Sequence, residues 1–180
     1  MRDLKRQFLL GPDVVFLNHG SFGATPRPVF EVYQEWQRCL ERQPVDFLVN
    51  QIPDHLAEAR QSLGDYINTG RDDVVYVPNA TFALNVIARS LDLGPGDEVL
   101  TTDHEYGACD NVWKFLSRKR GFSYKQQAIS FPTEPNEAIV DQIVQGVTAQ
   151  TKVVFVSHIT SETALRMPVS KISQLASEKG

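Results

Sequence analysis

From about residue 71 onward, short runs of β-branched and aromatic residues alternate with longer segments whose apolar positions recur at helical spacing. The predicted strands are residues 74–77, 98–102, 123–129 and 152–157. The predicted helices are residues 80–91, 108–120, 135–147 and 170 to the last residue. Strands separated by helices of this length are typical of βαβ crossovers. We therefore expect an α/β fold whose doubly wound, mostly parallel sheet carries helices on both faces.

The first 70 residues show a different pattern. Pro26 and Pro28 open a predicted helix with apolar residues at helical spacing, and a second helix is predicted over residues 53–68, ending at Gly70. No linker or repeat separates this region from the rest. We expect residues 1–70 to form an N-terminal helical arm and residues 71–180 to form an incomplete cofactor-binding domain.

The turn between the first predicted strand and its helix is a candidate anion site. Pro78 ends the apolar run, and Asn79 is a good N-cap for the helix that follows. The free N–H groups at such a helix start favour a phosphate, and Thr81 adds a hydroxyl donor. An ordinary capped helix behind a core strand is the alternative interpretation of the same residues.

Polar residues also follow the next strands, at 103–106 and 158–163. In a parallel sheet, ligands bind at the carboxyl ends of the strands, in the loops that lead into the helices. Three polar clusters at one edge therefore indicate a bound cofactor. Asp103 and Glu105 fit a helix-capping or solvated role as well as a catalytic one, and His158 alone would be typical of a hydrogen-bonded core histidine.

Composition narrows the class of protein. The 180 residues are 42% hydrophobic and 22% charged, with a formal net charge of −4 and no long basic run. This argues against nucleic acid or an anionic membrane as a partner. Two cysteines make neither a disulfide framework nor a metal site, and no apolar run approaches membrane-spanning length. We expect a cytoplasmic protein that binds no metal.

Four segments in this order resemble one family. They are Phe-Leu-Asn-His-Gly-Ser-Phe-Gly at 16–23, Asn-Ala-Thr at 79–81, Asp-His-Glu-Tyr-Gly-Ala at 103–108, and Ser-His-Ile-Thr-Ser at 157–161 followed by Met-Pro-Val at 167–169. The chain is similar to the first half of the class V aminotransferases, fold type I enzymes that use pyridoxal 5′-phosphate (PLP). Within that family, the isopenicillin N epimerase-like branch has the motifs most similar to those of this chain.

The resemblance implies roles for residues of the cofactor site. Asn79, Ala80 and Thr81 would bind the PLP phosphate. Tyr106 would stack on the pyridine ring, with His104 as the competing candidate. Ser161 would donate a hydrogen bond to the phenolic oxygen of PLP, although Thr160 or Thr163 could make the same contact.

The N-terminal motif would close over the substrate through Asn18, His19 and Gly20, where small residues let the backbone approach. Arg42 would bind a substrate carboxylate, or else remain a solvated arginine at a helix C-terminus. The implied substrate is an amino acid, and the implied assembly is a homodimer.

No catalytic residue is identifiable. PLP enzymes need a lysine for the internal Schiff base and an acid for the pyridinium nitrogen. The family has both in segments that would lie after residue 180, so we expect this chain to be a fragment without activity of its own. Epimerisation, transamination and lyase chemistry remain open, as do a desulfurase-type enzyme and a non-catalytic remnant that keeps the fold. No glycine-rich nucleotide motif follows any strand.

Overall fold

The computed structural model describes residues 4–20, 22–130 and 136–179. Ser21 of the first motif and Pro135, the predicted start of a helix, lie outside these residues. The chain divides into two compact units, Met1–Tyr76 and Val77–Gly180. Each unit is described by itself.

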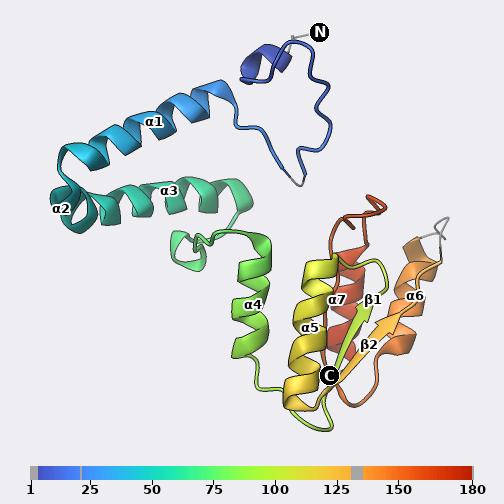
Figure 1. Cartoon of the computed structure of the whole chain (residues 1–180). Helices are drawn as coiled ribbons and strands as arrows, with labels where there is room; N and C mark the ends of the chain where they lie inside the picture. The colour runs from blue at the N-terminus through green and yellow to red at the C-terminus, as the bar shows by residue number, and fades with distance from the viewer. Residues whose placement is uncertain (1–3, 21, 131–135, 180) are drawn as a thin grey trace. The chain divides into compact units, whose positions relative to one another are not determined.

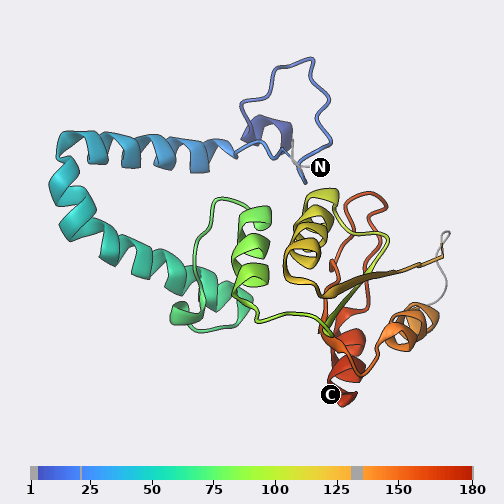
Figure 2. The same ribbon diagram turned by 60° about the horizontal axis from the view of Figure 1, so that its bottom comes forward.

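The N-terminal unit is mainly helical. Its helices are α1 (Arg27–Arg42), α2 (Pro44–Asp46) and α3 (Ile52–Ile67), with a π turn at Phe47–Gln51 and 3₁₀ turns at Leu4–Gln7 and Arg71–Asp73. A proline occupies the first turn of α1, α2 and α3, where its missing N–H costs no helical hydrogen bond. The chain reverses direction between α1 and α3 at α2 (Figures 1 and 2).

The predicted end of α3 was wrong in its detail. Asn68, with φ of 62°, takes the left-handed position that caps the helix, whereas Gly70 lies in the extended region. Asparagine tolerates this conformation because its short polar side chain can hydrogen-bond locally. Glycine is required instead at Gly64, where an added Cβ would lie 2.8 Å from the Thr69 carbonyl oxygen.

The C-terminal unit is an α/β layer structure. Its elements are α4 (Ala80–Ser90), β1 (Glu98–Thr102), α5 (Gly107–Arg120), β2 (Ser123–Gln127), α6 (Asn136–Gly146), β3 (Thr151–Val154) and α7 (Val169–Glu178). The three strands form a parallel sheet in the order β2-β1-β3. Most element ends fall within three residues of those predicted.

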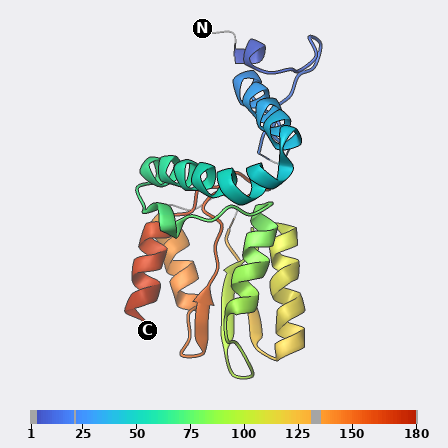
Figure 3. The ribbon, with the colours of Figure 1, turned by 90° about the vertical axis from the view of Figure 1, so that its left-hand side faces the viewer.

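Helices cover both faces of this sheet, as predicted (Figure 3). One buried cluster joins α4 and α5 to Val99 of β1, and a second joins α6 and α7 to Val154 of β3. Leu100 lies on the α6 face, because its methyl carbons would be 3.1 Å from a Cβ on Gly146. Val99 and Leu100 are fully buried, so the central strand supplies both cores.

The predicted strand at residues 74–77 is absent from the described structure. Val74 is extended, with φ of −112° and ψ of 128°, but no described strand pairs with it. Val75 and Tyr76 are exposed. Apolar β-branched composition favours an extended backbone, yet a strand also needs a hydrogen-bonded neighbour, which composition does not supply.

Candidate cofactor site

The start of α4 exposes backbone donors. The Phe82 N–H donates to the Asn79 side-chain oxygen at 2.9 Å, and the Ala83 N–H donates to the Asn79 carbonyl at 3.1 Å. The N–H groups of Ala80 and Thr81 precede both and have no carbonyl to reach within the helix. Asn79 is therefore an N-cap, while these two amides and the Thr81 hydroxyl form a donor set of the kind that binds a phosphate.

His104, in the loop after β1, is directed into the protein. Its Nε2 lies 3.0 Å from the Ile129 carbonyl oxygen, and its Nδ1 lies 3.4 Å from the Thr163 hydroxyl. A carbonyl oxygen only accepts, so Nε2 carries the proton. Asp103 supports the same contact by accepting the Ile129 N–H at 2.9 Å. The imidazole is thus fixed between two loops.

Tyr106 has the opposite orientation. It is the N-cap residue of α5, and its carbonyl accepts the N–H groups of Cys109 and Asp110 at 2.8 and 3.0 Å. Its side chain makes no capping hydrogen bond and is 49% exposed. The backbone of Tyr106 is therefore fixed, while its ring is accessible to a ligand.

The burial of Glu105 and its hydrogen-bond partners could not be predicted from the sequence. It is only 6% exposed. Its carboxylate accepts the Ser157 hydroxyl at 2.6 Å, the Ser157 N–H at 3.0 and 3.1 Å, and the Thr102 hydroxyl at 3.0 Å. The partner serine is 52 residues away, so no local spacing could have indicated it. Glu105 joins the carboxyl ends of β1 and β3.

The loop after β3 folds back on itself. Ile159 and Arg166 form an antiparallel bridge, and Ala164 takes a left-handed φ of 52° at the turn. The buried Thr160 hydroxyl accepts the Leu165 N–H at 2.9 Å and lies 2.7 Å from the Thr163 hydroxyl.

These contacts separate the three hydroxyls considered for the cofactor. Thr160 and Thr163 are engaged with each other and with neighbouring groups. Ser161 is exposed, on the outside of the same loop. The structure thus brings His104 and Thr163 together and leaves Ser161 accessible.

Two side chains near α5, Cys109 and Tyr124, are held in their neutral forms. Burial, and then the negative charge of Glu105, raise the pKa of the Cys109 thiol. Burial and a hydrogen bond to Asp110 raise the pKa of Tyr124, whose hydroxyl donates to that carboxylate at 2.7 Å. Both groups remain protonated at neutral pH.

The loops converge at one end of the C-terminal unit. β1 and β3 are parallel, and Glu105 joins the loops that follow them. α4 and α5 lie side by side with their N-termini at this same end (Figure 3). Thr81 and Tyr106 therefore occupy the starts of neighbouring helices, at the edge where parallel α/β sheets bind ligands.

The predicted substrate residues belong to the N-terminal unit. The His19 ring packs edge-on against Phe16, with ring centroids 4.7 Å apart, and also contacts Phe8. Asn18 accepts the Phe22 N–H at 3.1 Å through its carbonyl. Gly20 and Arg42 are exposed. The aromatic contacts give His19 a packing role that the sequence did not predict.

This arrangement matches part of fold type I of the PLP-dependent enzymes. A solved structure of the lyase C-DES, with glycine linked to PLP, superposes with a TM-score of 0.85 at 21% identity, over 95% of this chain and 45% of that one. The cysteine desulfurase CsdA from Escherichia coli gives 0.80 at 19% identity, over 97% and 45%. At such identities the likeness shows the fold.

The sequence comparisons define the family. The aminotransferase class V model matches residues 23–180, and the chain belongs to that family of PLP enzymes. It is 32% identical to isopenicillin N epimerase from Streptomyces clavuligerus over 99% of its length, and 30% identical to L-cysteine desulfhydrase from Arabidopsis thaliana over 93%. It spans only 45% and 40% of these two relatives. No helix in the described part of the chain is long and apolar enough to cross a membrane.

Proposed function

We propose that the whole protein is a PLP-dependent enzyme that acts at the α-carbon of an amino acid, and that this chain contributes the phosphate end and one ring face of its site. When bound, PLP withdraws electrons from the α-carbon of an amino-acid substrate. The observation that carries the proposal is the start of α4, where Asn79 caps the helix and leaves the Ala80 and Thr81 amides for an anion.

Each accessible residue then has a defined task. The Thr81 hydroxyl and the two amides bind the phosphate, assisted by the helix dipole. Tyr106 presents its ring face to the pyridine. Ser161 donates its hydroxyl to the phenolic oxygen, while His104 stays hydrogen-bonded to Ile129 and holds the loop in place.

Substrate binding is assigned to the N-terminal unit. Asn18, His19 and Gly20 would line the amino-acid site, and the Arg42 guanidinium would pair with the substrate carboxylate. A homodimer and a cytoplasmic location belong to the same proposal. For the substrate residues, support comes from the order of the motifs and from relatives whose matches cover 99% and 98% of the chain.

A lyase or desulfurase reaction is the second candidate, favoured by the desulfhydrase and desulfurase relatives. Reactive cysteines have lowered pKa values in electropositive, accessible surroundings. Cys109 has a raised pKa and packs against the α4–α5 core. Cys109 is therefore unsuited to act as a nucleophile. The epimerase-like proposal stands first because two isopenicillin N epimerases are 32% identical to the chain over 99% and 98% of its length.

The test uses the complete product of the gene, purified with PLP. Amino acids are incubated with it in D₂O, and NMR follows deuterium entry at the α-carbon together with any released sulfide or keto acid. α-Exchange with inversion supports an epimerase, whereas sulfide release supports the second candidate. A folded protein that retains no PLP and exchanges no proton would leave only the non-catalytic remnant.

A further inference from the structure

Gly107, the first residue of α5, is a glycine that the fold does not require. A Cβ built at Gly107 would meet no heavy atom of the described chain within 4 Å, apart from its neighbours in sequence. Its φ lies outside the left-handed region that favours glycine. The first helical position also has no preference for glycine, since proline and acidic residues are favoured there. Alanine would therefore fit the backbone and the packing at this position.

Other glycines of the same unit have a visible structural reason. Gly121 has a φ of 84° and caps the end of α5, and an added Cβ at Gly146 would press against Leu100. Gly94 is the useful comparison, because it has the same open space as Gly107 and no left-handed φ. Gly94 lies in the turn before β1, whereas Gly107 follows β1. The two glycines are thus at opposite ends of the central strand, and Gly94 is a matched control.

Gly107 lies beside the aromatic ring that is assigned to the pyridine of PLP. It directly follows Tyr106, whose side chain is 49% exposed and makes no capping hydrogen bond. The N–H groups of Cys109 and Asp110 donate to the Tyr106 carbonyl, so the backbone around Gly107 is fixed. Consecutive Cα atoms are about 3.8 Å apart. A ligand ring that lies on Tyr106 therefore has Gly107 at its border.

The open space beside Gly107 is available to the amino acid rather than to the phosphate. Under the proposed function, the phosphate binds at the start of α4, at Thr81, and Gly107 belongs to α5. The amino acid is attached to the same pyridine ring and must enter from solvent. Gly107 is exposed to solvent. A substrate side chain can therefore pass over this residue.

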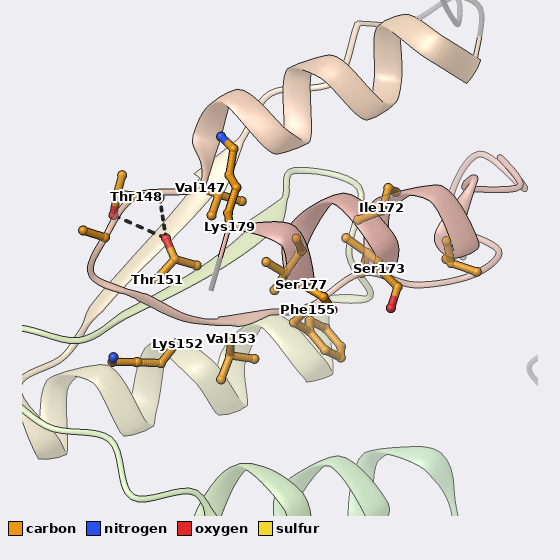
Figure 4. A pocket seen from close by; sticks show the side chains of 15 residues that line it. Val147, Thr148, Thr151, Lys152, Val153, Phe155, Ile172, Ser173, Ser177 and Lys179 are labelled. Carbon is orange, nitrogen blue, oxygen red and sulfur yellow. Dashed lines mark hydrogen bonds between the residues drawn. The ribbon is translucent and has the colours of Figure 1, made fainter.

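This space is distinct from the groove along β3. A cavity of about 670 Å³ is lined by β3 with its flanking residues and by one face of α7, including Ile172, Ser173 and Ser177 (Figure 4). Cavities of this size are ordinarily the first candidates for a small-molecule site. None of the residues that line this one belongs to α5 or to the loop after β1. The room beside Tyr106 comes instead from the missing side chain of Gly107.

We propose that Gly107 is a specificity-determining residue, which leaves room for a large side chain on the amino-acid substrate. The inference rests on the proposed function, because it takes the PLP ring to lie on Tyr106. It narrows the substrate class to amino acids with bulky side chains, which a Cβ at residue 107 would obstruct. Gly107→Ala keeps the backbone N–H and removes only the space.

The test uses the complete product of the gene, freed of PLP, and two stable adducts of the cofactor. N-phosphopyridoxyl-L-alanine and N-phosphopyridoxyl-L-phenylalanine share the phosphate and the ring and differ only in the amino-acid side chain. Fluorescence titration gives their dissociation constants. In Gly107→Ala the phenylalanine adduct should bind more weakly by about ten- to a hundredfold, because an added carbon overpacks the site. Binding of the alanine adduct should change little.

Urea unfolding supplies a second readout. Gly107→Ala should raise the urea midpoint slightly in the 180-residue chain and in the complete product, because alanine restricts the unfolded chain and favours the helix. The control Gly94→Ala should leave the binding of both adducts unchanged. A glycine that is needed only for structure would give the opposite result, a lower midpoint in Gly107→Ala.

Three results would overturn the proposal. Equal weakening of both adducts in Gly107→Ala would mean that the added Cβ obstructs the cofactor itself. Unchanged binding of both would mean that no ligand group passes residue 107. A midpoint lowered in the complete product alone would show that another part of the polypeptide fills the space. Failure of the parent protein to bind even the alanine adduct would contradict the proposed function, and the assignment of Gly107 with it.

Discussion

The turn at Asn79–Thr81 and the loop at His104–Tyr106 begin neighbouring helices at the same end of the sheet, but they are stabilised in different ways. Asn79 makes a local contact to Phe82, three residues on, and the whole turn is exposed or half-buried. The loop is fastened by Glu105 and His104 to segments far along the chain. The turn keeps its donors for a ligand, whereas the loop uses its polar groups to hold its own shape.

Because of this difference, we expect mutations in the turn and mutations in the loop to have different effects. Substitutions in the turn should change ligand binding and leave folding nearly intact. Substitutions of the buried polar groups in the loop should change folding first. Tyr106 is the exception, because its side chain is half exposed and makes no capping hydrogen bond.

The largest expected effect follows Glu105→Ala. Removing the carboxylate leaves the partly buried Ser157 N–H and hydroxyl without their acceptor. The free energy of unfolding should fall by about 3 kcal/mol. Urea titration followed by Trp113 fluorescence in a Trp36→Phe background measures it. The control is Glu162→Ala, at an exposed acid in the loop after β3, which should change stability little. Equal losses of stability in Glu105→Ala and Glu162→Ala would contradict the prediction.

Thr81→Val tests the turn in the complete protein. The variant removes one hydroxyl from a charge-assisted contact with phosphate worth about 1.5–3 kcal/mol, so PLP retention should fall by roughly one to two decades. Dialysis followed by cofactor quantitation measures this. Thr81→Ser should retain PLP, and both variants should unfold at the same urea concentration as the parent. Unchanged PLP retention in Thr81→Val would mean that the Thr81 hydroxyl does not contact the phosphate.

A smaller effect is expected from substitutions of Tyr106 and His104, which are compared as a pair. Tyr106→Ala should shift the visible absorption of the cofactor and lower turnover, since an aromatic contact contributes about 0.5–1.5 kcal/mol. Tyr106→Phe should preserve both. His104→Ala should instead lower stability by about 1 kcal/mol through the lost bond to Ile129. The opposite result, with the spectrum lost only in His104→Ala, would assign ring stacking to His104.

The smallest effect concerns the Cys109 thiol. Burial and the charge of Glu105 both raise its pKa, so Glu105→Gln should lower that pKa by removing the second cause. In a Cys39→Ser background, the rise of alkylation rate with pH should move to lower pH in Glu105→Gln. The onset should stay above that of free cysteine, because burial remains. A profile identical to the parent would show that the Glu105 charge does not reach the thiol.

The elements that the sequence predicted best are those fixed by local chemistry. The helix cap at Asn79 and the strand at 98–102 follow from capping and apolar patterning, and both are present. The predicted strand at 74–77 failed because pairing depends on a second strand. Glu105 was misjudged for the same reason, since its partner Ser157 is distant in sequence. Patterning cannot show which buried acid will meet a buried donor.

In the central strand β1, the alternation of apolar and polar residues that usually specifies the register is absent. Val99 and Leu100 are both fully buried, on opposite faces, so a slip by one residue would exchange one apolar side chain for another. The alignment is instead specified by polar contacts near the two ends. The Thr101 hydroxyl donates to the Phe155 carbonyl at 2.7 Å, and the Thr151 hydroxyl donates to Glu98 at 2.5 Å. These two threonine contacts therefore fix the register of β1 against β3. Replacing both threonines with valine would keep the apolar pattern but would allow the two strands to pair in a shifted register.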